Sequence, residues 1–375
     1  MAGQPWCRGD VGGVRFLFLQ ILFMILNVRP KWKIKLRNLL LIVIWLRCAA
    51  MGKQRLFYVD ALRGFAILLV IIGHLPLYCY KDVDASPLFS FVTVFHMPLF
   101  MMISGCVLNF DTFSLGKRFK VLIPFFFFGI LYSSLIIGCS VFGFLGNEAK
   151  CGYWFLWAIS IFFLFLYIIR LSKMNPVLGM VITEVIFLLL HFFFHRTTIG
   201  TTISTDSLWR LWPFFSLGVL KSVWFDWIRQ RTKLAFSLCA ITICLVLFIG
   251  IYYNLFDTYW PCGILRLIMA FPICIMLVLL FYYAEMKCKN KSFAIKGCLK
   301  RMGSEIGTNT LQIYVLHYFI LHYLDLHFFG QYMIDNNMIW LEFIVSPVLA
   351  ILISYICIYV SKLLYKMKLG IVFGR

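Results

Sequence analysis

Two polar residues, Arg63 and His74, stand eleven positions apart in an otherwise apolar stretch of the chain. Each α-helical residue turns about 100°, so the two side chains share one stripe of a helix, about 16 Å apart along its axis. Asp60 falls near the same stripe. Charged groups and imidazoles are costly inside lipid, and their presence in an apolar helix predicts a functional site. Histidine is the usual general base near neutral pH, so we expect His74 to accept a proton.

Two further histidines are expected at the depth of His74. By helical rise, His74 and His96 lie about 9 Å and about 12 Å below the outer ends of two consecutive apolar stretches. His317 lies about 16 Å in from the cytoplasmic end of a later stretch, on the same helix face as Tyr314. We expect the three imidazoles to meet somewhat outside the midplane. For His96 and His317 the alternative, a hydrogen-bonded packing residue, stays open.

The elements that must position these residues are membrane helices. Hydrophobic residues make up 62% of the 375 residues and charged residues 13%, with a mean hydropathy of +0.91, whereas soluble domains carry about 25% charged residues. This balance predicts an all-α polytopic integral membrane protein in contact with the lipid bilayer. The net charge of +20 is spread over short loops between apolar spans, which excludes a nucleic-acid-binding surface.

The apolar stretches predict about ten transmembrane helices. Loop charges are strongly uneven, with 21 Lys and Arg residues on one side and three on the other, namely Lys81, Lys150 and Arg196. The positive-inside rule puts the 21 in the cytoplasm, together with both termini. The predicted spans are 60–80, 88–109, 121–141, 153–170, 176–195, 209–222, 234–254, 262–284, 306–328 and 339–361.

The first fifty residues do not fit this pattern. Their apolar runs, 16–26 and 39–46, are too short to span a membrane, and a basic run separates them. A basic interfacial helix is one interpretation. The favoured interpretation is that residues 1–50 are a misassigned leader, that Met51 is the start, and that 51–375 form one transmembrane domain.

The cysteines, a basic loop and an aromatic segment indicate which ligands the protein could bind. The 13 cysteines are scattered and form no CxxC pair or Cys/His cluster with zinc spacing, so we expect neither disulfides nor a bound metal. Lys117, Arg118 and Lys120 follow the second span, either as topogenic charges or as a cytoplasmic anion site. Trp154 opens the fourth span in a sequence typical of an interfacial aromatic belt.

Several of these segments together resemble the membrane acyltransferase-3 family, and within it the fucose 4-O-acetylase-like acetyltransferases. The resemblance covers about residues 54 to 365 and follows the family's order of motifs. Arg63 and His74 resemble its Arg-x10-His signature. The other matching segments are Phe95-His96-Met97-Pro98-Leu99-Phe100 with Ile103-Ser104-Gly105, the basic loop from Lys117 to Pro124, Tyr153-Trp154-Phe155-Leu156, Phe214-Phe215-Ser-Leu-Gly218 and Leu311-Gln-Ile-Tyr314-Val-Leu-His317.

The resemblance implies transfer of an acyl group, usually acetyl, from acyl-CoA to a sugar hydroxyl in a cell-surface glycan or its lipid-linked precursor. Acetyl-CoA would be a co-substrate, with no bound cofactor. His74, as the general base, and Arg63 would be the catalytic residues; Arg63 would hold the acyl donor or, paired with Asp60, brace the helix. The remaining side chains would bind the acyl donor or the acceptor, with His96, Ser104 and Tyr314 as candidate donors to the oxyanion; this set comprises Asp60, His96, Ser104, Lys117, Arg118, Lys120, Trp154, Tyr314 and His317.

The implied location is the inner membrane of a bacterium. A second function, transport of a lipid-linked glycan, suits a polytopic protein with buried polar residues as well. A transporter is expected to contain discontinuous helices and an internal repeat. The oligomeric state, the acceptor sugar and the acyl chain stay open.

Overall fold

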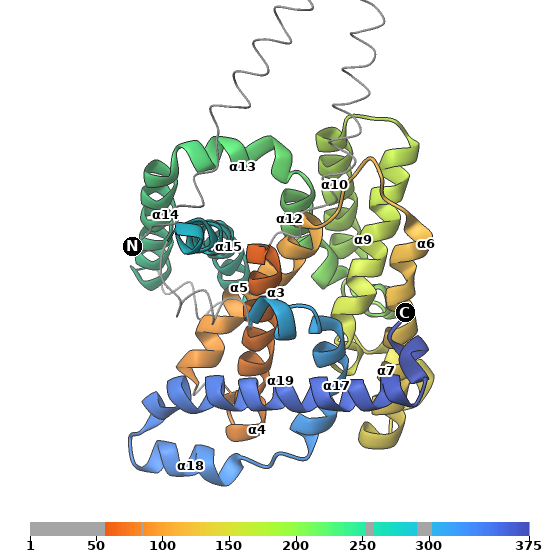
Figure 1. Cartoon of the computed structure of the whole chain (residues 1–375), viewed down its shortest axis with the longest axis vertical. Helices are drawn as coiled ribbons and strands as arrows, with labels where there is room; N and C mark the ends of the chain where they lie inside the picture. Colours follow the sequence, from red (N-terminus) through yellow and green to blue (C-terminus); the bar gives the residue numbers. More distant parts are fainter. Residues whose placement is uncertain (1–56, 84–85, 253–258, 291–301, 375) are drawn as a thin grey trace, which may run out of the picture. The chain divides into compact units, whose positions relative to one another are not determined.

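The computed structural model describes residues 57–374, apart from 84–85, 253–258 and 291–301 (Figure 1). The predicted leader, 1–50, and the predicted start at Met51 lie outside the described residues. Residues from Phe57 onward form one compact unit. Every regular element in the described part of this unit is helical, as the composition predicted.

Eight helical segments of the described chain are long and apolar enough to cross a membrane. A helix needs about 20 residues to span the hydrocarbon core, and each of these segments has between 18 and 28. The polytopic all-α fold is therefore confirmed. In chain order they are built from α3 (Phe57–His74) with α4 (Pro76–Cys79), α5 (Pro87–Cys106), α6 (Leu115–Arg118) with η2 (Phe119–Val121), α7 (Leu122–Tyr132) and η3 (Ser133–Ile137), α9 (Trp154–Leu171), α10 (Pro176–Phe194), α14 (Thr232–Tyr252), α15 (Tyr259–Asn290), and η7 (Ile339–Leu341) with α19 (Glu342–Lys366).

Two of the ten predicted spans are shorter than expected. Span 209–222 appears as α12 (Thr205–Val219, 15 residues) and span 306–328 as α17 (Thr310–His322, 13 residues), which follows the π-helical turn η6 (Met302–Ile306). At about 1.5 Å per residue, neither crosses the hydrocarbon core alone. More than half of the residues of each are buried, and non-helical backbone next to such helices is tolerated at membrane depth when protein surrounds it.

Shorter helices join the long ones. In Figure 1, α13 (Lys221–Gln230) links α12 to α14, and α18 (His327–Asp335) lies beside α4. The remaining short elements are α8 (Val141–Gly146), η4 (Lys150–Gly152), α11 (Thr198–Ile203) and η8 (Leu369–Phe373).

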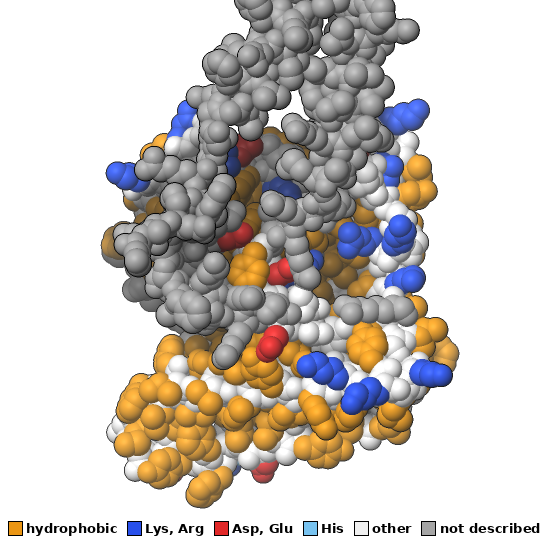
Figure 2. Space-filling model, viewed as in Figure 1, with side chains coloured by type: hydrophobic (Ala, Val, Ile, Leu, Met, Phe, Trp, Pro, Cys, Tyr) orange, Lys and Arg blue, Asp and Glu red, His pale blue; other side chains and the backbone are white. Residues whose placement is uncertain are grey.

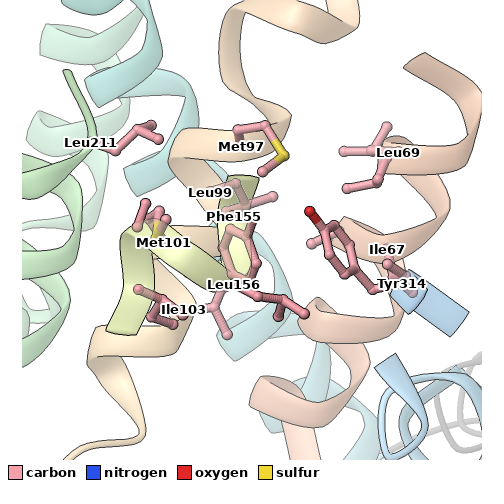
Figure 3. Packing of buried hydrophobic residues seen from close by; sticks show 14 of the residues in the cluster. Ile67, Leu69, Met97, Leu99, Met101, Ile103, Phe155, Leu156, Leu211 and Tyr314 are labelled. Carbon is pink, nitrogen blue, oxygen red and sulfur yellow. The ribbon is translucent and has the colours of Figure 1, made fainter. Parts of the chain in front are cut away.

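Helix α3, which carries Arg63 and His74, lies at the centre of this unit (Figure 1). Thirteen of its 18 residues are buried, which is the surface expected of a helix surrounded by others. Figure 3 shows apolar side chains of α3 and α5 meeting those of α9 and α17, with the Tyr314 ring beside Ile67. Peripheral helices such as α10 and α14 instead turn many large apolar side chains outward, where lipid would cover them.

Two glycines let α5 and α12 pack with their backbones in contact. A Cβ on Gly105 would lie 2.2 Å from the carbonyl oxygen of Phe215, and one on Gly218 would lie 2.1 Å from that of Met102. Small residues at such crossings are the usual means of close helix association in membranes. The crossing fixes the helix that carries His96.

A buried carboxylate ties the connection between α4 and α5 to the start of α19. Glu342, 2% exposed, accepts hydrogen bonds from the Tyr80 hydroxyl at 3.1 Å, the Ser86 hydroxyl at 2.8 Å and the Leu88 amide at 2.8 Å. Each carboxylate oxygen is therefore satisfied, as a buried charge requires. This connection directly follows the helix end that carries His74.

Candidate active site

His74 is the last residue of α3 and is half-buried. Its Nε2 lies 2.9 Å from the hydroxyl oxygen of Tyr318 on α17. Its ring centroid lies 5.5 Å from that of His317 and 5.1 Å from that of Tyr318. The structure therefore surrounds the predicted base with an imidazole and a phenol from a helix far away in the chain.

Tyr318 is not among the residues predicted from the sequence. The residue stands next to His317 and four positions after Tyr314, so it shares the Tyr314 face of the helix. Tyr318 and Tyr314 both donate to the carbonyl oxygen of Gly152, at 3.0 Å and 2.8 Å. The neighbouring Tyr153 donates to the carbonyl of Val315 at 2.8 Å. These three phenols join α17 to the loop before α9.

That loop has an unusual backbone. Lys150, Cys151 and Gly152 have φ angles of 46°, 50° and 97°, in the left-handed region that L-residues rarely adopt. Gly152 cannot carry a side chain, because a Cβ there would lie 2.4 Å from the Tyr318 ring. The loop therefore brings a backbone carbonyl, rather than a side chain, to the tyrosines.

Lys150 holds this loop in place. Its side chain is fully buried, and its Nζ donates to the carbonyls of Asn147 at 2.7 Å and Thr201 at 2.8 Å and to the Ser204 hydroxyl at 3.2 Å. Burial lowers the pKa of Lys150 to about 8. A buried ammonium with three acceptors is stable only in one geometry, so it pins the loop to the chain around Ser204.

The other two predicted histidines lie beside His74. Nδ1 of His317 lies 2.7 Å from the carbonyl oxygen of Tyr314, and its fully buried Nε2 has no hydrogen-bond partner among the described residues. Nδ1 of His96 lies 2.9 Å from the carbonyl oxygen of Val92. The His96 ring contacts the helix at Gly73, where a Cβ would lie 3.8 Å from Nε2. The three imidazoles thus lie around the C-terminal end of α3.

The expected oxyanion donors are already engaged. Ser104 donates to the carbonyl of Phe100 at 2.8 Å, about 12 Å along α5 from His96, and Tyr314 donates to Gly152. With Nδ1 of His96 donating to Val92, its Nε2 is an acceptor in the neutral ring. In this arrangement each of the three uses its proton on a backbone carbonyl. Trp154 is the half-buried first residue of α9, two positions after Gly152.

Arg63 lies towards the other end of α3. The continuous helix separates it from His74 by about 16 Å, as predicted. Its Nη1 lies 3.4 Å from Oδ1 of Asp60, a buried carboxylate. Close by is a small pocket, lined by Tyr58, Val59, Leu62, Ile103, Cys106, Lys221, Trp224, Phe225 and Val278. Within it, the Lys221 ammonium donates to the carbonyl of Cys106.

The basic loop is exposed and does not reach the histidines. Lys117, Arg118 and Lys120 lie on α6 and η2 with solvent-exposed side chains. Tyr132, at the far end of α7, lies about 18 Å along the helix from Lys120, and its ring is 5.8 Å from that of Tyr318, so the histidines lie far from the basic loop. Figure 2 shows Lys and Arg side chains over α6 and the C-terminal end of α19.

A second pocket lies near Glu342 rather than at the histidines. This small pocket is lined by residues that include Pro76, Tyr80, Phe329 and Glu342. Neither this pocket nor the one beside Arg63 has His74, His96 or His317 in its lining. In the described part of the chain, no group of three His, Cys, Asp or Glu side chains is arranged to hold a metal ion. The imidazoles and phenols around His74 are groups that donate and accept hydrogen bonds.

Comparison with known proteins gives one family and two curated relatives. Residues 56–359 match the sequence profile of a family described as "Acyltransferase domain". The chain is 29% identical to the nodulation protein NolL of Sinorhizobium fredii over 224 residues, which cover 53% of this chain and 58% of that protein. It is 36% identical to NolL of Mesorhizobium japonicum over 137 residues, or 31% of this chain and 36% of that protein. The chain thus spans less than two thirds of either relative. No solved structure matches it.

Proposed function

The chain belongs to the acyltransferase family whose profile it matches, and from this premise we propose that it is a membrane O-acyltransferase with His74 as its general base. The acyl group, in the first instance acetyl, passes from acyl-CoA to a hydroxyl of a sugar in a cell-surface glycan or its lipid-linked precursor. The relatives are bacterial proteins, and we assign the enzyme to a bacterial inner membrane.

One observation carries the proposal. The half-buried imidazole of His74 is held at Nε2 by Tyr318, and the ring of His317 lies next to it with a buried nitrogen that has no hydrogen-bond partner among the residues that the structure describes. A sugar hydroxyl is a weak nucleophile and needs a base within hydrogen-bond reach. Two adjacent imidazoles, one of them with an unused acceptor, suit the binding and deprotonation of such a hydroxyl.

The reaction follows from these groups. His74 takes the proton of the acceptor hydroxyl as its oxygen forms a bond to the thioester carbon. The carbon–sulfur bond then breaks, and the imidazolium returns the proton to the leaving thiolate of CoA. Products are the acyl ester and free CoA thiol, and His74 is neutral again. Because His96, Ser104 and Tyr314 already donate to carbonyls, this scheme assigns no oxyanion donor among them.

Acyl-CoA, the acyl donor, is proposed to enter from the end of α3 that carries Arg63, opposite to the end that carries His74. Acyl-CoA combines a polyanionic nucleotide with a long, flexible pantetheine arm that ends in the thioester. The exposed Lys117, Arg118 and Lys120 suit the phosphates, and the pocket beside Arg63 combines Lys221 with aromatic rings. Asp60 braces Arg63 in this scheme. The arm would then cover the distance to His74.

The acceptor is proposed to bind near the outer end of the helices. Trp154 lies just after the turn at Gly152, whose carbonyl binds Tyr318. Aromatic side chains are common in sugar and glycan recognition because they offer a large flat surface with a polar edge. We therefore assign Trp154 to the acceptor side of the site.

The test is an acyl-transfer assay with purified protein. The protein in lipid nanodiscs is given radiolabelled acetyl-CoA and a lipid-linked glycan extract, and both CoA thiol release and label in the glycan are measured. Label transfer that is lost in His74→Gln supports the proposal. If no acyl-CoA is turned over but the protein moves lipid-linked glycan across a vesicle membrane, the transporter interpretation replaces it.

A further inference from the structure

We propose that the Gly152 carbonyl, held by Lys150, acts through Tyr318 to fix the tautomer of His74, so that Nε2 carries the proton and Nδ1 is the free base. Lys150, Gly152 and Tyr318 are then positioning residues for His74. The inference rests on the proposed function only in calling His74 the base. The tautomer itself is a property of the protein alone.

The number of protons available to the Tyr318 hydroxyl and its two neighbours determines the tautomer of His74. The Tyr318 hydroxyl has one proton and two neighbours within hydrogen-bond distance, the Gly152 oxygen at 3.0 Å and His74 Nε2 at 2.9 Å. A carbonyl oxygen can only accept, whereas a histidine nitrogen donates or accepts according to the tautomer. Both contacts are hydrogen bonds only if Tyr318 donates to Gly152 and His74 Nε2–H donates to Tyr318.

The tautomer also sets the state of the other ring nitrogen of His74. A neutral imidazole with a proton on Nε2 has its lone pair on Nδ1. Within the described part of the chain, Nδ1 of His74 makes no hydrogen bond. Nδ1 of His96 and of His317 instead faces a carbonyl of its own helix. Of the three imidazoles, His74 is therefore the one whose Nδ1 is available to a substrate hydroxyl.

The carbonyl group of Gly152 is fixed in its orientation toward Tyr318. Three consecutive residues with positive φ aim it at α17, the absent Cβ of Gly152 lets Tyr318 approach, and the Lys150 ammonium anchors the loop through three acceptors. Tyr314 donates to the same oxygen. An acceptor held this firmly orients the proton of Tyr318, as second-shell partners of histidine commonly do.

Histidine nitrogen chemical shifts test the tautomer directly. Protein labelled with ¹⁵N-histidine is reconstituted in liposomes for magic-angle-spinning NMR, and the His74 signals are identified by their loss in His74→Gln. We expect wild-type His74 with a protonated Nε2 and an unprotonated Nδ1, and a mixture of tautomers in Tyr318→Phe. Wild-type His74 with its proton on Nδ1 would overturn the inference, whatever the protein catalyses.

The role of Lys150 is tested by a double-mutant cycle. Lys150→Met and Tyr318→Phe are each expected to lower kcat about 3-fold to 10-fold with KM unchanged, the loss typical of one hydrogen bond to a neutral group. The double variant should lose no more than Tyr318→Phe alone, since Lys150 acts through Tyr318. If the reductions of kcat in the two single variants multiply in the double variant, Lys150 only stabilises the fold. Lys81→Met, an exposed lysine of another loop, is the matched control.

The two readouts separate the two hypotheses. If wild-type protein turns over no acyl-CoA while His74 has the expected tautomer, the proposed function fails and the positioning inference stands. If transfer is active but Tyr318→Phe changes neither the tautomer nor kcat, the positioning inference fails alone. Should Lys150→Met not fold, the tautomer and kcat of Tyr318→Phe still decide between these outcomes.

Discussion

The hydroxyl oxygen of Tyr318 lies 2.9 Å from Nε2 of His74, although 244 positions separate the two residues in the chain. The contact joins the end of α3 to the middle of α17. It places a tyrosine where hydrolytic enzymes often use a carboxylate to orient the base. A neutral partner orients the ring without adding a charge that would have to be buried in the membrane.

Replacing His74 should abolish acyl transfer and leave the fold intact. Loss of a general base typically costs about 10²-fold to 10⁴-fold in rate, and we expect this loss in kcat for His74→Gln. The measurement is label transfer from acetyl-CoA at saturating donor. His327→Gln, at an exposed histidine of α18, should keep full activity. A His74→Gln protein within a few-fold of wild type would remove His74 from the mechanism.

Neutralising the basic loop should weaken donor binding. In the triple variant Lys117→Gln, Arg118→Gln, Lys120→Gln, we expect KM for acetyl-CoA to rise by about 10-fold and to depend less on salt, since exposed charge pairs are weak singly and screened. The assay is KM at low and high ionic strength, with kcat as internal reference.

The control for that variant neutralises three other exposed cations on the side predicted to be cytoplasmic, Lys173, Arg231 and Lys233. This control should leave KM unchanged. Topology is checked in both variants by cysteine accessibility, because removal of positive charge can invert a neighbouring span. If KM changes equally in the two triple variants, the change reflects the overall surface charge, and the basic loop has no specific role in donor binding.

Removing the buried carboxylate of Glu342 should destabilise the protein. Glu342→Ala leaves three buried donors without an acceptor, and we expect a loss of about 3 kcal/mol in the free energy of unfolding. Glu342→Gln should lose less, because its amide oxygen can still accept from Leu88 and its NH₂ can donate to the hydroxyls. Thermal unfolding in detergent measures both, with the exposed Glu305→Ala as control. Equal stability of all three would contradict the structure here.

Lys150 should make stability rise with pH in the alkaline range. Burial lowers its pKa to about 8 from an ordinary 10.5, so between these values the unfolded chain binds more protons than the folded one. The free energy of unfolding then increases with pH, by up to about 3 kcal/mol across this window, and this contribution is absent below pH 8. The stability of wild type relative to Lys150→Met should therefore grow from pH 7.5 to pH 9.5. A constant difference would place the pKa of Lys150 outside this window.

Local sequence patterns determined much of the fold. Composition predicted a polytopic helical protein, because apolar runs of about 20 residues have no other stable form in a bilayer. Helical periodicity placed Arg63 and His74 on one stripe, and the continuous α3 has that geometry. The two shorter helices were predicted too long, since hydropathy does not reveal that a buried helix can end within the membrane when protein surrounds it.

The candidate active site was likewise predicted from the sequence only in part. Residue type and depth along the helices singled out His74, His96 and His317, because a polar side chain in an apolar run is a local signal. Only the tertiary structure decided what orients His74. The orienting group is a backbone carbonyl at Gly152, which has no side chain to mark it. Lys150 stood in the sequence only as one of three basic residues on the outer side. Its side chain is bound by Thr201 and Ser204, more than 50 residues away, and the contact of its loop with Tyr318 joins segments more than 160 residues apart. No local periodicity encodes either contact.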